Sequence, residues 1–338
     1  MKFEVLTEKE FKNFASKHDQ ESFYQTLNWA ELKTNTGWTN FLVGVKKDNK
    51  VIAASLILSK KTPIGKNMFY APRGFLIDYN DYKLLEFFTR EIKKFAKKNK
   101  AIFVKIDPYI SYQDRDIEGN IIKGGNNNFK AYKNLIKLKY KHKGFNLMQE
   151  ELQPRWIFVT ETKNKTLEEI FSKMDAKTRQ ILRKNERNKI RVREISYDEL
   201  DKFKSIMEHT GERRGFIDRP LSYYKSMYKS MSKDNLIKVC LAEVDCRELI
   251  NEYLDEINVL EEEIKLRDEQ FKKDPSKINS KKYEQRKENS LRDIQRLNKN
   301  INHIKELKKE NGNILTLGGI MFLISNNEVL SSVGGSYD

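Results

Sequence analysis

The stretch RELINEYLDEINVLEEEIKLRDEQF, residues 247–271, decides the outline of the fold. Its apolar residues are spaced alternately by three and four, which is typical of a helix with a narrow apolar seam. These seam residues are Ile250, Tyr253, Ile257, Leu260 and Ile264. Asp274-Pro275-Ser276 then predicts a break, because proline cannot continue a helix.

A second run with helical spacing follows the break and ends at Asn311-Gly312, a typical C-cap. Its apolar residues are Leu291, Ile294, Leu297, Ile301, Ile304 and Leu307. Residues 247–271 carry three Lys/Arg and nine Asp/Glu, whereas residues 281–310 carry ten and five. The opposite charges predict that the two helices fold back on each other. We therefore expect residues 247–312 to form an antiparallel coiled-coil arm that projects from the body. The alternative is a plain helical pair packed on the body.

The composition excludes several classes of protein. The chain has 338 residues, a net charge of +16 and 38% hydrophobic residues, which suits two domains with one unusually polar stretch. No run approaches the ~20 apolar residues of a membrane span, and the N-terminus lacks the pattern of a secretory signal. Two cysteines and four histidines give neither a disulfide framework nor a zinc pattern, so we expect reduced thiols, no metal and a cytoplasmic location.

The residues outside the arm predict an α/β body with two similar halves. We expect a first domain at residues 1–152 and a second at residues 153–246 and 313–338, with the arm inserted between two neighbouring strands. The expected strands are residues 3–6, 41–46, 51–60, 101–107 (buried), 156–161, 190–194, 236–244, 314–324 and 328–333. Lys47-Asp48-Asn49-Lys50, between the second and third of these, predicts a hairpin. The expected helices are residues 8–17, 81–98, 129–142, 166–184, 197–209 and 221–232. No closing helix follows the expected turn at Gly334-Gly335, so we expect the second domain to be truncated at its C-terminus.

Basic residues suggest a polyanionic partner such as nucleic acid, nucleotide phosphates or an anionic membrane face. Residues 174–193 carry a net charge of +6, and Arg213-Arg214 lies in an expected Gly-flanked loop. Paired arginines suit phosphate recognition. The alternatives are a solvated surface and a basic composition of genomic origin.

Asp107 follows an expected strand and precedes Pro108, so its carboxylate could open towards a cleft and act as a general base. The alternative is that Asp-Pro simply ends the strand. The sequence contains no nucleophile elbow, Walker loop or dinucleotide fingerprint. We therefore expect chemistry by positioning and proton transfer, without a covalent enzyme intermediate.

An ordered set of short motifs resembles the FemABX family of peptidoglycan cross-bridge aminoacyltransferases. The motifs are Tyr24–Lys33 with Gly37-Trp38, Tyr70-Ala71-Pro72-Arg73-Gly74, Lys105-Ile106-Asp107-Pro108, Gln153-Pro154-Arg155-Trp156, Lys177-Thr178-Arg179, Arg213 with Phe216 and Tyr223-Tyr224, and Gly334-Gly335-Ser336. The resemblance implies two GNAT-like acyltransferase domains, a coiled-coil arm in the second domain, and further strands and helices after the last motif. Residues 185–188 depart from the family's usual turn.

The resemblance also implies the reaction. The donor would be an aminoacyl-tRNA, and the acceptor an amine on the stem peptide of a UDP-linked or lipid-linked muropeptide precursor, with no cofactor. A lipid-linked acceptor would bring the protein to the inner membrane face. By resemblance, Lys33 and Arg213 would bind the acceptor's pyrophosphate, and Asp107 would act near the acceptor amine. Arg73, Arg179 and Tyr224 would line the cleft.

Two other functions stay open. The half-domain fold also suits an acyl-CoA-dependent N-acetyltransferase, although the expected pyrophosphate loop, Arg/Gln-x-x-Gly-x-Gly/Ala, does not occur in the sequence. A non-catalytic tRNA-binding protein could use the arm and the basic residues 174–193.

Overall fold

The computed structural model describes residues 1–116, 118–145, 153–275 and 279–337. By their contacts, the residues divide into two compact units. Unit 1 comprises Met1–Thr160, Arg219–Lys238 and Phe322–Ser332, and unit 2 comprises Glu161–Asp218, Val239–Met321 and Val333–Asp338. The expected domain boundary at residue 152, the last residue of the predicted break (276) and the final residue of the chain (338) lie outside the described residues.

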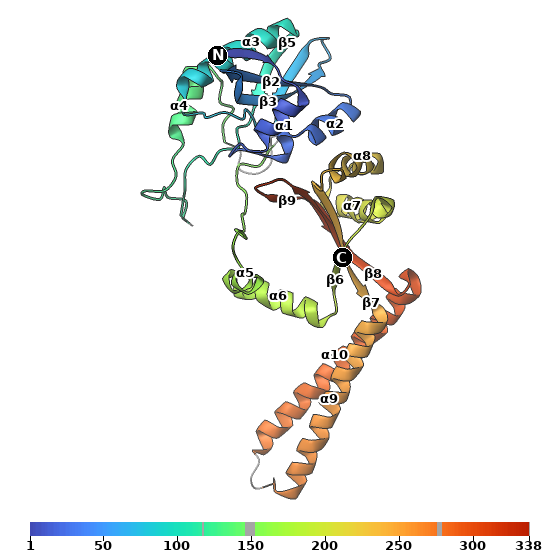
Figure 1. Ribbon diagram of the computed structural model, residues 1–338. Helices are drawn as coiled ribbons and strands as arrows, with labels where there is room; N and C mark the ends of the chain where they lie inside the picture. The colour runs from blue at the N-terminus through green and yellow to red at the C-terminus, as the bar shows by residue number, and fades with distance from the viewer. Residues whose placement is uncertain (117, 146–152, 276–278, 338) are drawn as a thin grey trace. The chain divides into compact units, whose positions relative to one another are not determined.

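Unit 1 is built on a five-stranded sheet in the order β1-β2-β3-β4-β5 (Figure 1). The strands are β1 (Lys2–Val5), β2 (Thr39–Lys47), β3 (Lys50–Lys61), β4 (Asn67–Ala71) and β5 (Ala101–Ile106). Neighbours are antiparallel except β4 and β5, which run parallel. Asp48 and Asn49 join β2 to β3 with positive φ values of 49° and 60°, which confirms the predicted hairpin.

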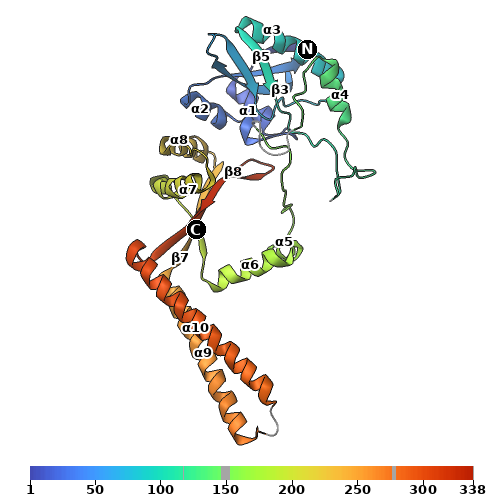
Figure 2. The same cartoon turned by 180° about the vertical axis from the view of Figure 1, so that it is seen from behind.

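Helices cover both faces of this sheet. In Figures 1 and 2, α3 (Tyr82–Lys98) lies on one side, and α1 (Glu8–Ala15) and α2 (Leu27–Asn35) lie on the other. The apolar face of α3 packs on Val43, Ile57 and Phe69 of the strands, and all three side chains are fully buried. Unit 1 also contains η1 (Phe23–Gln25), α4 (Phe129–Lys137) and α8 (Leu221–Ser232). Helix α8 lies against α2, where the Asn28 amide donates to the carbonyl of Ser230 at 2.8 Å.

The second sheet has the order β6-β7-β8-β9. Its strands are β6 (Arg191–Glu194), β7 (Ile237–Asp245), β8 (Ile314–Ile324) and β9 (Val329–Ser336). The remaining helices before the insertion are α5 (Leu167–Lys173), α6 (Ala176–Arg187), η2 (Tyr197–Glu199) and α7 (Leu200–Arg214). Hydrogen bonds from Cys246 N to Asn313 O and from Ile324 N to Leu236 O join opposite ends of β7 and β8, so these strands are antiparallel.

Two long helices, α9 (Cys246–Lys273) and α10 (Ser280–Asn311), occupy the connection between β7 and β8. They run side by side in both views (Figures 1 and 2). Ile257, Leu297 and Ile301 form the buried core of the contact. The two predicted helices and their ends are confirmed, because α9 is capped by Asp274 and α10 by Gly312.

Several predictions in the body are wrong. Strand β5 is not buried, since Ile102 is 52% and Phe103 47% exposed. Residues 156–161 are not a strand, because they pair with no strand among the described residues. The helix expected at residues 166–184 is interrupted at Met174-Asp175, where Asp175 caps α6. The helix expected to reach residue 142 ends at Lys137.

The glycines account for two further errors. Gly211 does not end a helix, because α7 continues to Arg214 and ends at Gly215, whose φ is +74°. The Gly211 position lacks room for a Cβ, which would lie 2.8 Å from the carbonyl oxygen of Phe216. Gly334-Gly335 is not a turn but part of β9. A Cβ at Gly335 would collide with the Thr210 side chain on α7, so glycine lets strand and helix approach closely.

Candidate active site

Asp107 directly follows β5, and its carboxylate is held from two directions. The Tyr70 hydroxyl donates to Oδ2 at 2.8 Å, and the backbone N–H of Arg73 donates to Oδ1 at 2.7 Å. Tyr70 lies on β4, where it pairs with Lys105 in the parallel register. The parallel pairing thus places the ends of β4 and β5 side by side, and the carboxylate has a fixed orientation with lone pairs left to accept a proton.

The ionisation of this pair suits proton transfer. Burial raises the pKa of Asp107, while the hydrogen bonds from Tyr70 and Arg73 and the nearby charges of Arg73 and Lys105 oppose that rise. Burial and the negative charge of Asp107 raise the pKa of Tyr70 well above its usual value, so the hydroxyl keeps its proton at neutral pH. Asp107 is therefore a carboxylate of increased basicity, as a general base requires.

Asp107 and Arg73 line a cavity of about 1070 Å³ within unit 1. Basic side chains dominate its charged lining: Arg73, Lys105, Lys141, Lys143 and Arg155, against the single carboxylate of Asp107. Its apolar lining includes Phe103, Ile136 and Phe145, which are 41–49% exposed. The cavity combines a basic field, apolar contact area and one carboxylate, an arrangement suited to a large anionic substrate that also carries apolar groups.

Arg73 is itself positioned by an aromatic side chain. Its guanidinium lies 4.7 Å from the ring centroid of Tyr109, whose hydroxyl donates to Glu328 Oε2. Burial and the Glu328 carboxylate raise the pKa of Tyr109 to about 12. Glu328 belongs to the turn between β8 and β9, which is part of unit 1. A segment more than 200 residues away in the sequence therefore helps to shape this site.

Lys33 on α2 lies in a second cationic cluster of unit 1. Its Nζ is 4.4 Å from the ring centroid of Trp29 and 5.9 Å from that of Tyr223. Burial, together with the positive charges of Arg219 and Lys60, lowers the pKa of Lys33 to about 8. A bound anion would relieve this repulsion, so the cluster favours phosphate or carboxylate binding.

Tyr24 links the Lys33 cluster to Asp107. Its ring meets Trp29 edge-on with centroids 4.8 Å apart. The side chain of Gln153 hydrogen-bonds to both Tyr24 and Tyr70. A continuous row of polar and aromatic side chains thus runs from the anion-binding cluster to the carboxylate.

The other predicted site residues lie elsewhere. Arg213, in the last turn of α7 in unit 2, donates to the carbonyl oxygen of Ser336 at 3.0 Å and to its Oγ at 3.3 Å. Arg179 on α6 donates to the carbonyl oxygens of Ser172 and Met174, so it caps the C-terminal end of α5. Tyr224 is 2% exposed, whereas its neighbour Tyr223 faces Lys33. The structure thus joins Lys33, Arg73 and Asp107 through contacts within unit 1.

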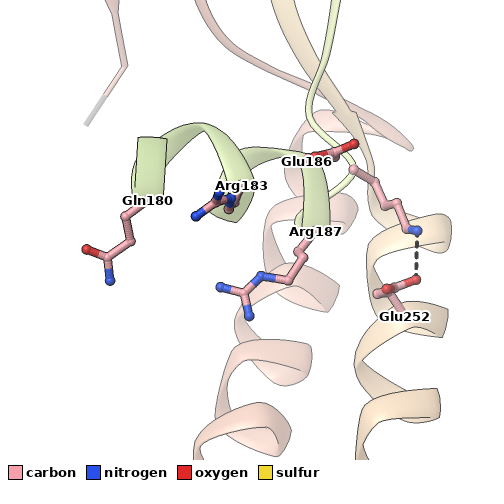
Figure 3. A pocket seen from close by; sticks show the side chains of 6 residues that line it. Gln180, Arg183, Glu186, Arg187 and Glu252 are labelled. Atoms are coloured by element: carbon pink, nitrogen blue, oxygen red, sulfur yellow. Dashed lines mark ion pairs between the residues drawn. The ribbon is translucent and has the colours of Figure 1, made fainter. Parts of the chain in front are cut away.

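The basic residues 174–193 divide into paired and projecting side chains. Arg193 is held by Glu199 and Glu243, with its closest contact at 2.6 Å, and Arg191 and Lys189 pair with carboxylates on α9. Gln180, Arg183 and Arg187 line an open hollow of about 610 Å³ between α6 and α9 (Figure 3). Only part of the predicted cluster is therefore available to a polyanion.

Sequence reasoning did not assign roles to Tyr24, Tyr70, Tyr109, Gln153 and Glu328. Tyr24, Tyr70 and Gln153 lie inside quoted family motifs, so the signal was present without a role attached. Tyr109 and Glu328 carry no motif, and only folding brings them together. Among the residues that the structure describes, no cluster of His, Cys, Asp and Glu could hold a metal ion, and no helix has the length and apolarity to cross a membrane.

Comparisons with known proteins identify the family of this chain. Residues 6–338 match the FemAB family. The aminoacyltransferase FemA of Staphylococcus epidermidis is 35% identical over 340 residues, which cover 99% of this chain and 80% of that protein. FemA of Staphylococcus aureus is 32% identical over 339 residues, with 99% and 79% covered. The crystal structure of FemX superposes with a TM-score of 0.74 at 26% identity, covering 100% of this chain and 81% of the other. The chain therefore belongs to the FemAB family and is an aminoacyltransferase.

Proposed function

We propose that this aminoacyltransferase moves an amino acid from an aminoacyl-tRNA to a stem-peptide amine of a peptidoglycan precursor, as a step of cross-bridge synthesis. The observation that carries the proposal is Asp107: a carboxylate with a raised pKa, fixed by Tyr70 and Arg73, in the wall of a large basic cavity. The FemA relatives support the transfer of an aminoacyl group.

The chemistry needs positioning and one proton acceptor. The acceptor amine attacks the ester carbonyl carbon, so a C–N bond forms and the C–O bond to the tRNA ribose breaks. Asp107 takes the proton that the amine loses, and the departing ribose oxygen gains a proton. The ester is already activated, so this route uses no covalent enzyme intermediate. The Lys33 cluster would hold the precursor's phosphates, because the positive charges of Arg219 and Lys60 act on the same site as that of Lys33.

In this arrangement the acceptor phosphates lie at Lys33 and the amine lies at Asp107. The acceptor then extends along the row of side chains through Tyr24 and Gln153. Arg213 and Tyr224 remain proposed acceptor contacts by family resemblance. The exposed residues Arg183 and Arg187 on α6 offer a phosphate-binding surface for the tRNA.

A transfer assay with three donors tests this function. The purified chain is incubated with a lipid-linked or a UDP-linked precursor. The donor is charged tRNA, the same tRNA uncharged, or acetyl-CoA, and products are read by mass spectrometry. We expect a mass increase of one amino-acid residue with charged tRNA alone. Acetylation of the precursor, or tRNA binding without transfer to either precursor form, would contradict the proposal.

A further inference from the structure

Residues 119–145 form a basic stretch without acidic residues. These 27 residues contain seven lysines and no aspartate or glutamate. The lysines are Lys123, Lys130, Lys133, Lys137, Lys139, Lys141 and Lys143, and all seven are exposed. The sequence analysis did not single out this stretch, because glycines, asparagines and apolar residues dilute its charge.

Large apolar side chains lie exposed among these lysines. They are Ile121, Ile122, Phe129, Ile136 and Phe145, with exposed fractions of 37–53%. Exposed apolar residues interspersed with lysines are typical of surfaces that enter the headgroup layer of an anionic bilayer. The phosphate backbone of a nucleic acid would pair with the lysines but would leave Ile121 and Ile122 exposed to water.

Ile121 and Ile122 lie in a hairpin-like excursion between β5 and α4 that extends away from the sheet of unit 1 (Figures 1 and 2). Its own contacts hold the excursion in shape. The Asp114 carboxylate accepts the backbone N–H of Asn126 at 2.8 Å, and the Asp116 carboxylate accepts that of Asn120 at 2.7 Å. Asp114 and Asp116, which precede the basic stretch, are thus engaged within the loop, and these contacts support the segment that carries the isoleucines.

Helix α4 presents the next part of the same surface. Ala131 and Leu138 are buried on unit 1, and the Asn134 amide donates to the carbonyl of Tyr79 at 2.9 Å. The exposed side of the helix carries Lys130, Lys133 and Lys137. The stretch ends at Lys141–Phe145, which line the cavity that contains Asp107. The surface is therefore continuous with the candidate active site.

We propose that residues 119–145 dock on an anionic phospholipid bilayer, with Ile121 and Ile122 inserted among the headgroups and the lysines on the lipid phosphates. This inference rests on the proposed function in one respect: it would bring the mouth of the Asp107 cavity to a lipid-linked acceptor. The occupant is a bilayer, because positive charge without carboxylates and exposed aliphatic side chains occur together on one surface.

Vesicle co-sedimentation tests the docking. The full chain is mixed with vesicles of phosphatidylcholine alone or of phosphatidylcholine with about one third phosphatidylglycerol. We expect binding to the anionic vesicles only, weakening as salt rises. The triple variant K130E/K133E/K137E should lower the partition coefficient on the order of 100-fold, since each lysine near the surface contributes about fivefold. I121S/I122S should lower it about tenfold or more.

The matched control is R183E/K184E/R187E on α6, which makes the same change in net charge at three other exposed positions. It should retain anionic vesicle binding within about twofold of the parent chain, because these residues lie outside the proposed surface. Equal binding to neutral vesicles, a larger loss in the α6 variant, or a wild-type level of vesicle binding in K130E/K133E/K137E would overturn the inference. Loss of tRNA binding in K130E/K133E/K137E with intact vesicle binding would identify a nucleic-acid surface instead. Unchanged melting temperatures show that the variants fold.

Transfer assays separate this inference from the proposed function. K130E/K133E/K137E should transfer to a water-soluble acceptor at the parent rate and lose transfer only to a vesicle-embedded one. Equal losses on both acceptors would contradict the docking. If the parent chain transferred to neither acceptor, the proposed function would be contradicted. The vesicle-binding measurements would still test the docking.

Discussion

At the scale of single residues, the site depends on how Asp107 is held. One carboxylate oxygen accepts a hydrogen bond from a side chain, and the other accepts one from the backbone. Loss of one donor should therefore leave the carboxylate oriented by the other but should change its pKa. The hydrogen bond from Tyr70 lowers the pKa of Asp107 against the larger effect of burial. Tyr70 is therefore a positioning residue whose removal should change a pH profile rather than abolish the reaction.

Tyr70→Phe tests this role. Without the hydroxyl, the pKa of Asp107 should rise, so the acidic limb of the kcat profile should move to higher pH. Profiles of kcat against pH for the parent chain and the variant measure the shift. Tyr112→Phe, on a tyrosine for which no such bond to Asp107 is present, is the control and should leave the limb in place. A shift to lower pH would contradict the assignment.

Lys33 gives a second pH-dependent prediction. Its pKa of about 8 means that the ammonium is present at pH 7 and is mostly lost at pH 9. On the proposed function, affinity for a pyrophosphate-bearing acceptor should fall about tenfold between those values, because binding needs the charged form. Lys33→Arg should bind the acceptor with little pH dependence in this range, since arginine stays protonated. Calorimetric titration at pH 7, 8 and 9 measures both, and an equal pH dependence in the two proteins would exclude Lys33 as the cause.

At the scale of elements, the helical pair and the β2–β3 hairpin were predictable because their signals are local. Heptad spacing, opposite charges and Gly312 fixed α9 and α10, and Asp48-Asn49 fixed the turn. The sequence-based predictions were wrong where tertiary contacts determine the local structure. Gly334-Gly335 is typical of a turn in sequence, yet both glycines belong to β9, and α7 approaches Gly335 too closely for a side chain. Likewise, Tyr109 and Glu328 meet only after folding.

The seam between α9 and α10 can be tested by truncation. Leu297→Ala removes a side chain that is 3% exposed in the interhelical core, and we expect a destabilisation of about 2–4 kcal/mol. Leu291→Ala makes the same change on the same helix at a residue that is 45% exposed and should cost less than about 0.5 kcal/mol. Urea unfolding followed by circular dichroism compares the two. Equal effects would show that Leu297 does not carry the packing between the helices.

At the scale of the whole molecule, the net charge of +16 is unevenly distributed along the chain. Residues 119–145 contribute seven positive charges, and the cavity beside them is lined by five cationic side chains. The long helices nearly balance their own charge, since residues 247–271 are acidic and residues 281–310 basic. Sequence alone identified the basic character and the family, but the grouping of cations around Asp107 required the folded chain.

The charge distribution predicts a salt-dependent donor interaction. On the proposed function, binding of charged tRNA should weaken linearly in a plot of log affinity against log salt concentration. Arg183→Glu/Arg187→Glu should reduce the magnitude of the slope by about two, because two phosphate contacts are lost. Fluorescence anisotropy over a salt series measures both slopes. An unchanged slope would remove α6 from the tRNA-binding surface.

On the proposed function, Asp107 accepts the proton of the attacking amine. The most direct measurement is the single-turnover rate of amino-acid transfer by Asp107→Asn at saturating substrates, beside the matched change Asp48→Asn in the exposed β2–β3 turn. We expect Asp107→Asn to lower the rate about 10²–10⁴-fold with acceptor affinity little changed, and Asp48→Asn to transfer at the parent rate. Transfer by Asp107→Asn at the parent rate would contradict this role of Asp107.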